Sequence, residues 1–103
     1  MKSFNKYLFL EDLSIQLKAE IEKYNVESMD SVHILIDEII NSECTYTSDC
    51  FEICIELDAT DFNAYQWPVN NIEQLAFVAL YDFVHAEFDY LEINDLIDNK
   101  VNA

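Results

Sequence analysis

The sequence has no glycine, no arginine and only one proline, at position 68. Tight two-residue hairpins and left-handed helix ends usually recruit glycine, so little of that turn chemistry is available to this chain. Loops that bind phosphate need glycine together with cations, and the nucleophile turn of serine hydrolases needs a serine flanked by glycines. The composition therefore favours helices that begin at Asn, Asp and Ser residues, and it excludes both of those loops.

Positive charge is almost absent from the body of the chain. All five cations are lysines near the two ends, and residues 24–99 contain 17 of the 21 acidic residues without a single lysine or arginine. The formal net charge is −16 at pH 7, so the folded surface is expected to repel nucleic acids and anionic membranes. It should attract cations and strongly basic proteins, at rates that fall as salt is added.

Long hydrophobic runs and a disulfide framework are also missing. No apolar run approaches the roughly 18 residues that a membrane-spanning helix needs, and the apolar stretch 7–10 is too short for a secretory signal. Three cysteines without a dense framework are atypical of small secreted domains. We therefore expect a cytoplasmic protein with buried free thiols and no membrane partner.

The chain does have enough apolar material for one compact core. Apolar residues make up 51% and aromatic residues 14% of its 103 residues, and they are interleaved with the acids throughout. Acidic disordered tails lack such residues. We therefore expect a single acidic domain over residues 1–103.

Along most of the chain, apolar residues recur at intervals of three or four, which is the spacing of one helix face. The predicted helices span about residues 10–24, 28 or 30 to 41, 72–88 and 93–100. A short helical turn is expected over residues 60–67, where Pro68 would stop it.

The helix over residues 72–88 is apolar on two sides. Asn70 or Asn71 is expected to cap its start. A helix of this kind lies either at the centre of a fold or in an interface between two copies. The sequence therefore predicts a central helix or a homodimer that forms through residues 72–88.

Residues 50–57 satisfy two periods at once. Their alternation of apolar and polar residues is typical of a strand, which would belong to a hairpin over about 44–57. Asp49 with Glu52 instead resembles a helix capping box, and the missing glycines disfavour a tight hairpin. We therefore predict an all-α fold, a compact bundle of about four to five short helices; the alternative is a small α+β domain with a hairpin at about 44–57.

Two Asp-x-x-His pairs have the spacing that puts both members on one side of a helix, Asp30 with His33 and Asp82 with His85. Di-iron bundles use a related pair twice, but they need further carboxylates and four long helices, which a chain this short hardly supplies. We interpret both histidines as surface residues beside surface carboxylates.

The other chemical signals are equally sparse. Cys44, Cys50 and Cys54 include no Cys-x-x-Cys pair of the kind that zinc sites use. The two histidines have no convincing nucleophile nearby in the sequence, and carboxylate pairs are too abundant to be diagnostic. We predict no catalytic residue, no cofactor and no metal, and the chain is not expected to be an enzyme.

The binding of a partner through surface charge is the kind of function that these observations leave open. Acids four residues apart on a helix are about 6 Å apart, a spacing comparable to that of charges along a nucleic-acid strand. A target that grips nucleic acid with lysine and arginine would find ion-pair partners on such a surface and would be blocked. Crowded carboxylates should also have raised pKa values, so mild acidification should stabilise the fold.

In size, in charge and in the exclusion of lysine and arginine over residues 24–99, the chain resembles the small acidic DNA-mimic proteins of phages and mobile elements. The resemblance is one of composition and rests on no motif, so it assigns a role to no individual residue. It implies an anti-CRISPR or anti-restriction inhibitor in the cytoplasm of a bacterial host cell. The implied partner is a basic nucleic-acid-binding protein, such as a CRISPR effector complex or a restriction enzyme, and not nucleic acid itself.

A second hypothesis is an immunity protein or antitoxin that neutralises a basic nuclease toxin. Such proteins also resemble acidic helical bundles, and they add aromatic anchors inside the charged rim. Tyr46, Tyr65 and Trp67 fall in predicted loops and could be such anchors, or they could pack within the fold.

Contact residues are expected among the acids of the cation-free stretch that helical spacing turns outward. The candidate partner-binding residues are Asp37, Glu38, Glu43, Glu52, Glu56, Asp58, Asp61, Glu87, Asp89, Glu92, Asp95 and Asp98. A solvated face without a partner is the alternative for any single member, so the prediction concerns the cluster.

Overall fold

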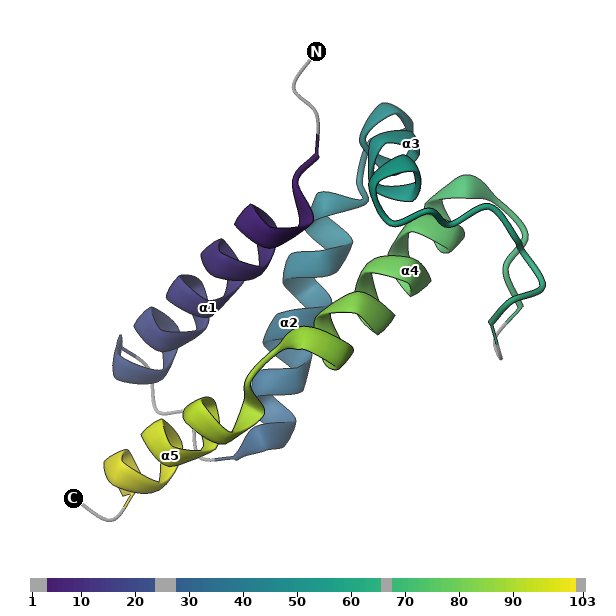
Figure 1. The fold of residues 1–103 in the computed structure, drawn as a ribbon. Helices are drawn as coiled ribbons and strands as arrows, with labels where there is room; N and C mark the ends of the chain where they lie inside the picture. Colours follow the sequence, from purple (N-terminus) through teal and green to yellow (C-terminus); the bar gives the residue numbers. More distant parts are fainter. Residues whose placement is uncertain (1–3, 24–27, 66–67, 102–103) are drawn as a thin grey trace.

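The described part of the chain contains five helices, joined by connecting segments (Figure 1). The structure is a computed structural model and describes residues 4–23, 28–65 and 68–101; of Lys100 and Val101 it describes the backbone only. The helices are α1 (Lys6–Lys23), α2 (Met29–Glu43), α3 (Thr47–Glu56), α4 (Ile72–Glu87) and α5 (Tyr90–Val101). The described residues contain no strand, so the prediction of an all-α fold is confirmed.

The segment with two competing periods forms α3, and the alternative hairpin at 44–57 is wrong. Cys50, Ile53 and Cys54 are buried, and α3 packs on α4. Ile55, in contrast, is 78% exposed. A strand would place Ile53 and Ile55 on the same face, so the burial follows the helical period.

The start of α3 does not have the predicted capping box, and its end has an unusual backbone conformation. The helix begins at Thr47, two residues before Asp49, so the capping box expected at Asp49 and Glu52 is wrong. After the helix, Asp58 has a φ of 56°, in the left-handed region that glycine usually occupies. Aspartate enters this region more readily than most residues, which lets a chain without glycine end the helix here.

Helix α1 begins four residues before its predicted start because its first turn is capped. Asn5 Oδ1 accepts hydrogen bonds from the backbone amides of Tyr7 at 3.1 Å and Leu8 at 3.0 Å. The buried face of α1 includes Leu13 and Leu17, and the helix packs on α2 and α5.

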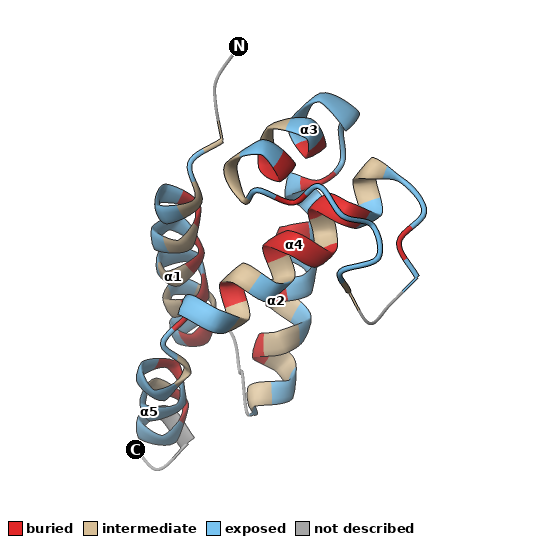
Figure 2. Cartoon of the chain, turned by 45° about the vertical axis from the view of Figure 1, so that its right-hand side comes forward, coloured by how far each residue is buried: buried red, intermediate tan, exposed pale blue. Residues whose placement is uncertain are grey.

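Helix α4 crosses the bundle and packs on both α2 and α3 (Figures 1 and 2). Asn71 Oδ1 accepts a hydrogen bond from the Gln74 amide at 2.9 Å, so the predicted cap is confirmed. Leu75, Leu80 and Val84 are buried. The chain's own packing thus accounts for the wide apolar surface of this helix, and the homodimer through residues 72–88 stays a prediction.

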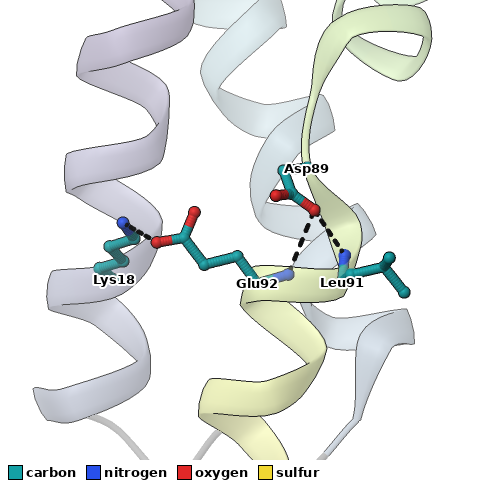
Figure 3. Close-up of polar contacts among 4 residues, drawn as sticks. All are labelled: Lys18, Asp89, Leu91 and Glu92. Atoms are coloured by element: carbon teal, nitrogen blue, oxygen red, sulfur yellow. Dashed lines mark hydrogen bonds and ion pairs between the residues drawn. The ribbon is translucent and has the colours of Figure 1, made fainter.

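Helix α5 begins three residues before its predicted start, again because of a capped first turn. The Asp89 carboxylate accepts hydrogen bonds from the backbone amides of Leu91 and Glu92, at 3.1 and 3.3 Å (Figure 3). Ile93 and Ile97 are buried, as the apolar spacing predicts, and α5 packs on α1.

The described residues of the connection between α3 and α4 form turns and contain no helix. The Ala64 amide donates to the Asp61 carbonyl at 3.3 Å, and this hydrogen-bonded turn is what the described residues retain of the helical turn expected over 60–67. Residues 66–67 lie outside the described part of the chain.

The molecule is elongated. Its radius of gyration is 14.8 Å and its principal extents are 46 × 31 × 20 Å, whereas a chain of this length typically has a radius of gyration of about 13 Å. Among the described helices, none has the length and apolar content needed to cross a bilayer. The elongation exposes a long surface relative to the volume of the core.

Candidate acidic binding surface

None of the candidate partner-binding acids is buried. Asp37, Glu38, Glu43, Asp58, Asp61, Glu87, Asp89, Glu92, Asp95 and Asp98 are exposed, and Glu52 and Glu56 are half-buried. More generally, no polar or charged residue in the described part of the chain is buried. The candidates are distributed over four helices and two connecting segments, and the structure brings only some of them together.

One group of acids lines a groove of about 440 Å³ between α1, α2 and the start of α3. We call it the acidic groove, and its carboxylates come from Asp12, Glu43, Asp49 and Glu52. No lysine is among the described residues that line it. Among the described residues, the groove therefore concentrates negative charge from three helices without a lysine to offset it.

Apolar side chains share the acidic groove with these carboxylates. Leu8 and Tyr46 belong to its lining, and they are 59% and 69% exposed. Phe4 and Ile39 also line it and are half-buried. A partner in this groove would meet an apolar surface and a group of carboxylates at once.

The pKa of Glu43 reflects the crowding of carboxylates in the acidic groove. Although the residue is exposed to solvent on one side, the surrounding protein partly desolvates its carboxyl group and raises the pKa of that group, and the carboxylates of Asp49 and Asp12 raise the pKa further. Both causes disfavour the charged form. A cation in the groove would relieve the repulsion, so the site is suited to bind positive charge.

A second group of acids lines a groove of about 430 Å³ between α1 and the start of α5, which we call the α1–α5 groove. Its acids are Glu11, Glu87, Asp89 and Glu92. Here the chain supplies its own cation, because Lys18 Nζ and the Glu92 carboxylate form an ion pair at 2.5 Å (Figure 3). The Asp89 carboxylate is also engaged, as the cap of α5, so this group is partly neutralised from within.

Two other candidates have structural partners. Glu56 accepts a hydrogen bond from the Lys6 amide at 3.2 Å, which ties the end of α3 to the start of α1. Asp61 accepts a hydrogen bond from the Asn63 amide at 2.9 Å. Both contacts hold backbone in place, so a substitution at either position would alter more than surface charge.

The interpretation of the histidines as surface residues is wrong. Both are half-buried and stacked on each other, with ring centroids 5.5 Å apart and planes inclined by 13°. The Tyr90 hydroxyl and His85 Nδ1 are hydrogen-bonded at 2.5 Å, while His85 Nε2 is buried without a hydrogen-bond partner. His33 comes from α2, His85 from α4 and Tyr90 from α5, so sequence spacing alone could not reveal this cluster.

Burial lowers the pKa of His85, and the nearby His33 lowers it further. Asp37 and Asp82 act in the opposite direction, because their charges favour a protonated ring. The result is an imidazole that favours the neutral form within the fold.

The three cysteines are free and buried, as predicted. The Cys50 thiol donates a hydrogen bond to the Cys44 carbonyl oxygen at 3.2 Å. Burial, followed by the charges of its neighbours, raises the pKa of Cys44 to about 12. Thiolate, the form that attacks electrophiles and binds zinc, is therefore disfavoured at this position. In the described part of the chain, no three His, Cys, Asp or Glu side chains are arranged to hold a metal.

Sequence reasoning missed Asp12 and Asp49 as members of the acidic groove. Asp12 lies outside the cation-free stretch 24–99, to which the candidates were restricted, and Asp49 was assigned to a cap. One signal was available for Asp12, which follows Leu8 by four residues and therefore lies on the same side of α1. Nothing in the sequence indicates that α3 would place Asp49 near Glu43.

The arrangement as a whole suits the binding of cationic groups. It combines surface carboxylates on every helix with one groove that lacks a lysine among its described lining residues. No protein family, curated protein or solved structure matches this chain. The class of partner is therefore argued from charge and shape.

Proposed function

We propose that this protein is an inhibitor that binds a basic nucleic-acid-binding protein or complex through an anionic surface that stands in for nucleic acid. The density of charge along the molecule carries the proposal. A net charge of −16 over a length of 46 Å corresponds to one unit charge per about 2.9 Å. A nucleic-acid strand carries one per about 3.4 Å and a DNA duplex one per about 1.7 Å.

The placement of the acids supports the same function. Because no described acid is buried, the negative charge faces solvent, where a partner can reach it. Lysine and arginine residues that normally contact phosphates can pair with carboxylates through charge-assisted hydrogen bonds. A CRISPR effector complex or a restriction enzyme of a bacterial host is the kind of target that such a surface would block.

An immunity protein that neutralises a basic nuclease toxin is the second candidate, and the exposure of Tyr46 favours it. This side chain is 69% exposed beside the carboxylates of the acidic groove, where an aromatic anchor would be expected. Tyr65 is half-buried against the core and is less suited to that role. Trp67 lies outside the described residues.

Affinity capture tests the proposal. The whole chain is immobilised and exposed to bacterial lysate at low and at moderate salt, and bound proteins are eluted with duplex DNA. We expect a nucleic-acid-binding nuclease or complex that is released by DNA and by salt, because both compete for the same cationic residues.

Other outcomes of the capture separate the candidates. A lone nuclease that salt releases but DNA does not would favour the immunity function, since an immunity protein can bind beside the catalytic site. Capture of no salt-sensitive partner would overturn the proposed inhibitor. The same lysate passed over an uncharged bait of similar size controls for adsorption to the matrix.

A further inference from the structure

We propose that the acidic groove is the primary docking site of the target and that it takes an arginine-bearing segment with an apolar face. This inference rests on the proposed function, because it assumes a basic protein partner. It adds which surface the partner contacts and which side chains of the partner the groove fits. The other acids then attract the partner without contacting it closely.

The apolar part of the groove argues for a protein segment rather than a free cation. Leu8 and Tyr46 are more than half exposed, although they lie beside the half-buried Phe4 and Ile39. Exposed leucine and tyrosine lose contact with water when a partner covers them, which favours association. A small inorganic cation would leave that apolar surface exposed.

The combination of Tyr46 with carboxylates argues for arginine rather than lysine. A guanidinium group stacks on an aromatic face and at the same time donates paired hydrogen bonds to a carboxylate. Asp49 and Glu43 lie close enough for their charges to interact, and both line the same groove as Tyr46. Lysine offers a compact charge that cannot satisfy both features in this way.

The two grooves differ in what they leave for a partner. In the α1–α5 groove, Lys18 already pairs with Glu92, and Asp89 caps a helix. In the acidic groove, desolvation first and then the charges of Asp49 and Asp12 raise the pKa of Glu43, and no lysine among the described lining residues offsets those charges. An incoming cation gains more where repulsion is unrelieved, so the acidic groove is the better docking site.

A defined peptide tests this inference on the full chain. The probe is a short helical peptide that carries arginine beside leucine on one face, and a second peptide replaces each arginine with lysine. Titration at low salt measures Kd for each, and backbone amide shifts of the native chain map the contact. We expect the arginine peptide to bind more tightly and to shift amides around Tyr46 and Asp49.

Matched variants separate the groove from the general field. D12N/D49N removes two charges from the groove, whereas D30N/D82N removes two exposed charges that do not line it. We expect D12N/D49N to raise Kd about tenfold and D30N/D82N to raise it no more than about threefold, since only the first removes direct partners. Both lower the negative charge equally, and thermal melts check that both fold.

A second pair of variants gives an independent measurement. Y46A removes the exposed ring in the groove, and L91A removes a side chain of α5 that is 77% exposed outside it. We expect Y46A to raise Kd by about threefold or more, because stacking is lost, and L91A to leave it unchanged.

Three results would overturn the groove as the docking site. These are equal weakening by the two double variants, amide shifts centred elsewhere, and failure of the native chain to bind the arginine peptide. The proposed function would survive each of them if lysate capture still recovered a DNA-displaced nucleic-acid-binding protein. Failure of the capture with success of the peptide would instead leave the groove intact and remove the inhibitor function.

Discussion

At the level of single side chains, partial desolvation shifts the pKa values of Glu43 and His85 in opposite directions. As the pH falls, the two shifts therefore have opposite effects on the stability of the fold. The pKa of Glu43 is raised in the folded state, so the fold binds this proton at a higher pH than the unfolded chain and gains stability on mild acidification. The pKa of His85 is lowered from 6.5, so below about pH 6.5 the unfolded chain binds that proton first and the fold loses stability. The pH dependence of stability therefore reflects His85 as well as the crowded carboxylates.

Substitution of His85 by glutamine separates the two effects. Glutamine does not titrate, so H85Q should not show the loss of stability that His85 causes as the pH falls. It should keep the gain in stability that comes from Glu43. Between pH 7 and about pH 5.5, we expect the melting temperature of H85Q to rise more, or to fall less, than that of the native chain, because histidine titrates near 6.5.

The comparison for H85Q concerns the change with pH and not the absolute melting temperature. The substitution also alters the contact with Tyr90, and near-UV circular dichroism at pH 7 checks that the tertiary packing is kept. The same change in melting temperature for both proteins would contradict a depressed pKa at His85.

At the level of elements, caps decide where these helices begin. The apolar spacing correctly indicated helices near α1, α2, α4 and α5, because their buried faces follow a helical period. It placed the starts of α1 and α5 too late, since the caps at Asn5 and Asp89 add a first turn that the predicted apolar stripes did not include. At Asn71 the predicted and observed caps coincide, and its side chain makes the capping hydrogen bond.

Removal of the Asn71 cap should destabilise α4 and, because α4 packs on α2 and α3, the whole fold. We expect N71A to lower the free energy of unfolding by about 1 kcal/mol, the typical value of such a cap. This corresponds to a fall in melting temperature of about 4 to 8 °C for a domain of this size.

The neighbouring variant N70A is the matched control. Asn70 contributes its backbone amide to the Gln74 side chain, at 2.7 Å, and this donor survives the substitution. We expect a change within about 0.5 kcal/mol, as for most surface positions. Equal losses for the two variants in urea unfolding would mean that the Asn71 side chain does not stabilise the helix.

At the level of the whole molecule, the charge that we propose attracts a basic partner should also destabilise the fold. The chain of 103 residues has a net charge of −16, so its negative charges repel one another in the folded state. None of the described acids is buried. The free protein is therefore expected to be less stable than the protein neutralised by cations or by its target. Binding and stability are linked through one electrostatic field.

Salt should accordingly stabilise the free protein while it weakens binding. An increase from about 0.1 to about 1 M NaCl shortens the screening length from about 10 to about 3 Å, so we expect the melting temperature to rise. D95N/D98N, which removes two exposed charges from α5, should begin at a higher melting temperature and gain less from salt. A native melting temperature that does not respond to salt would contradict self-repulsion.

The sequence by itself determined the fold class, and it also supplies the charge argument on which the proposed class of partner rests. Helical spacing of apolar residues, the absence of glycine and the segregation of lysines at the ends are local or compositional features, and they remain visible without coordinates. They also indicated the free, buried thiols. Even the ambiguous residues 50–57 were correctly favoured as helical, because a tight hairpin needs glycine.

Only the tertiary structure decided which acids meet. It joined Asp12 of α1 with Glu43 of α2 and Asp49 of α3 in one groove, while Lys18 and the start of α5 engaged Glu92 and Asp89 elsewhere. It also moved the two histidines from the expected surface into a stacked cluster. These outcomes depend on how separate helices pack, and a side chain's neighbours across helices are set by that packing and not by spacing along one helix.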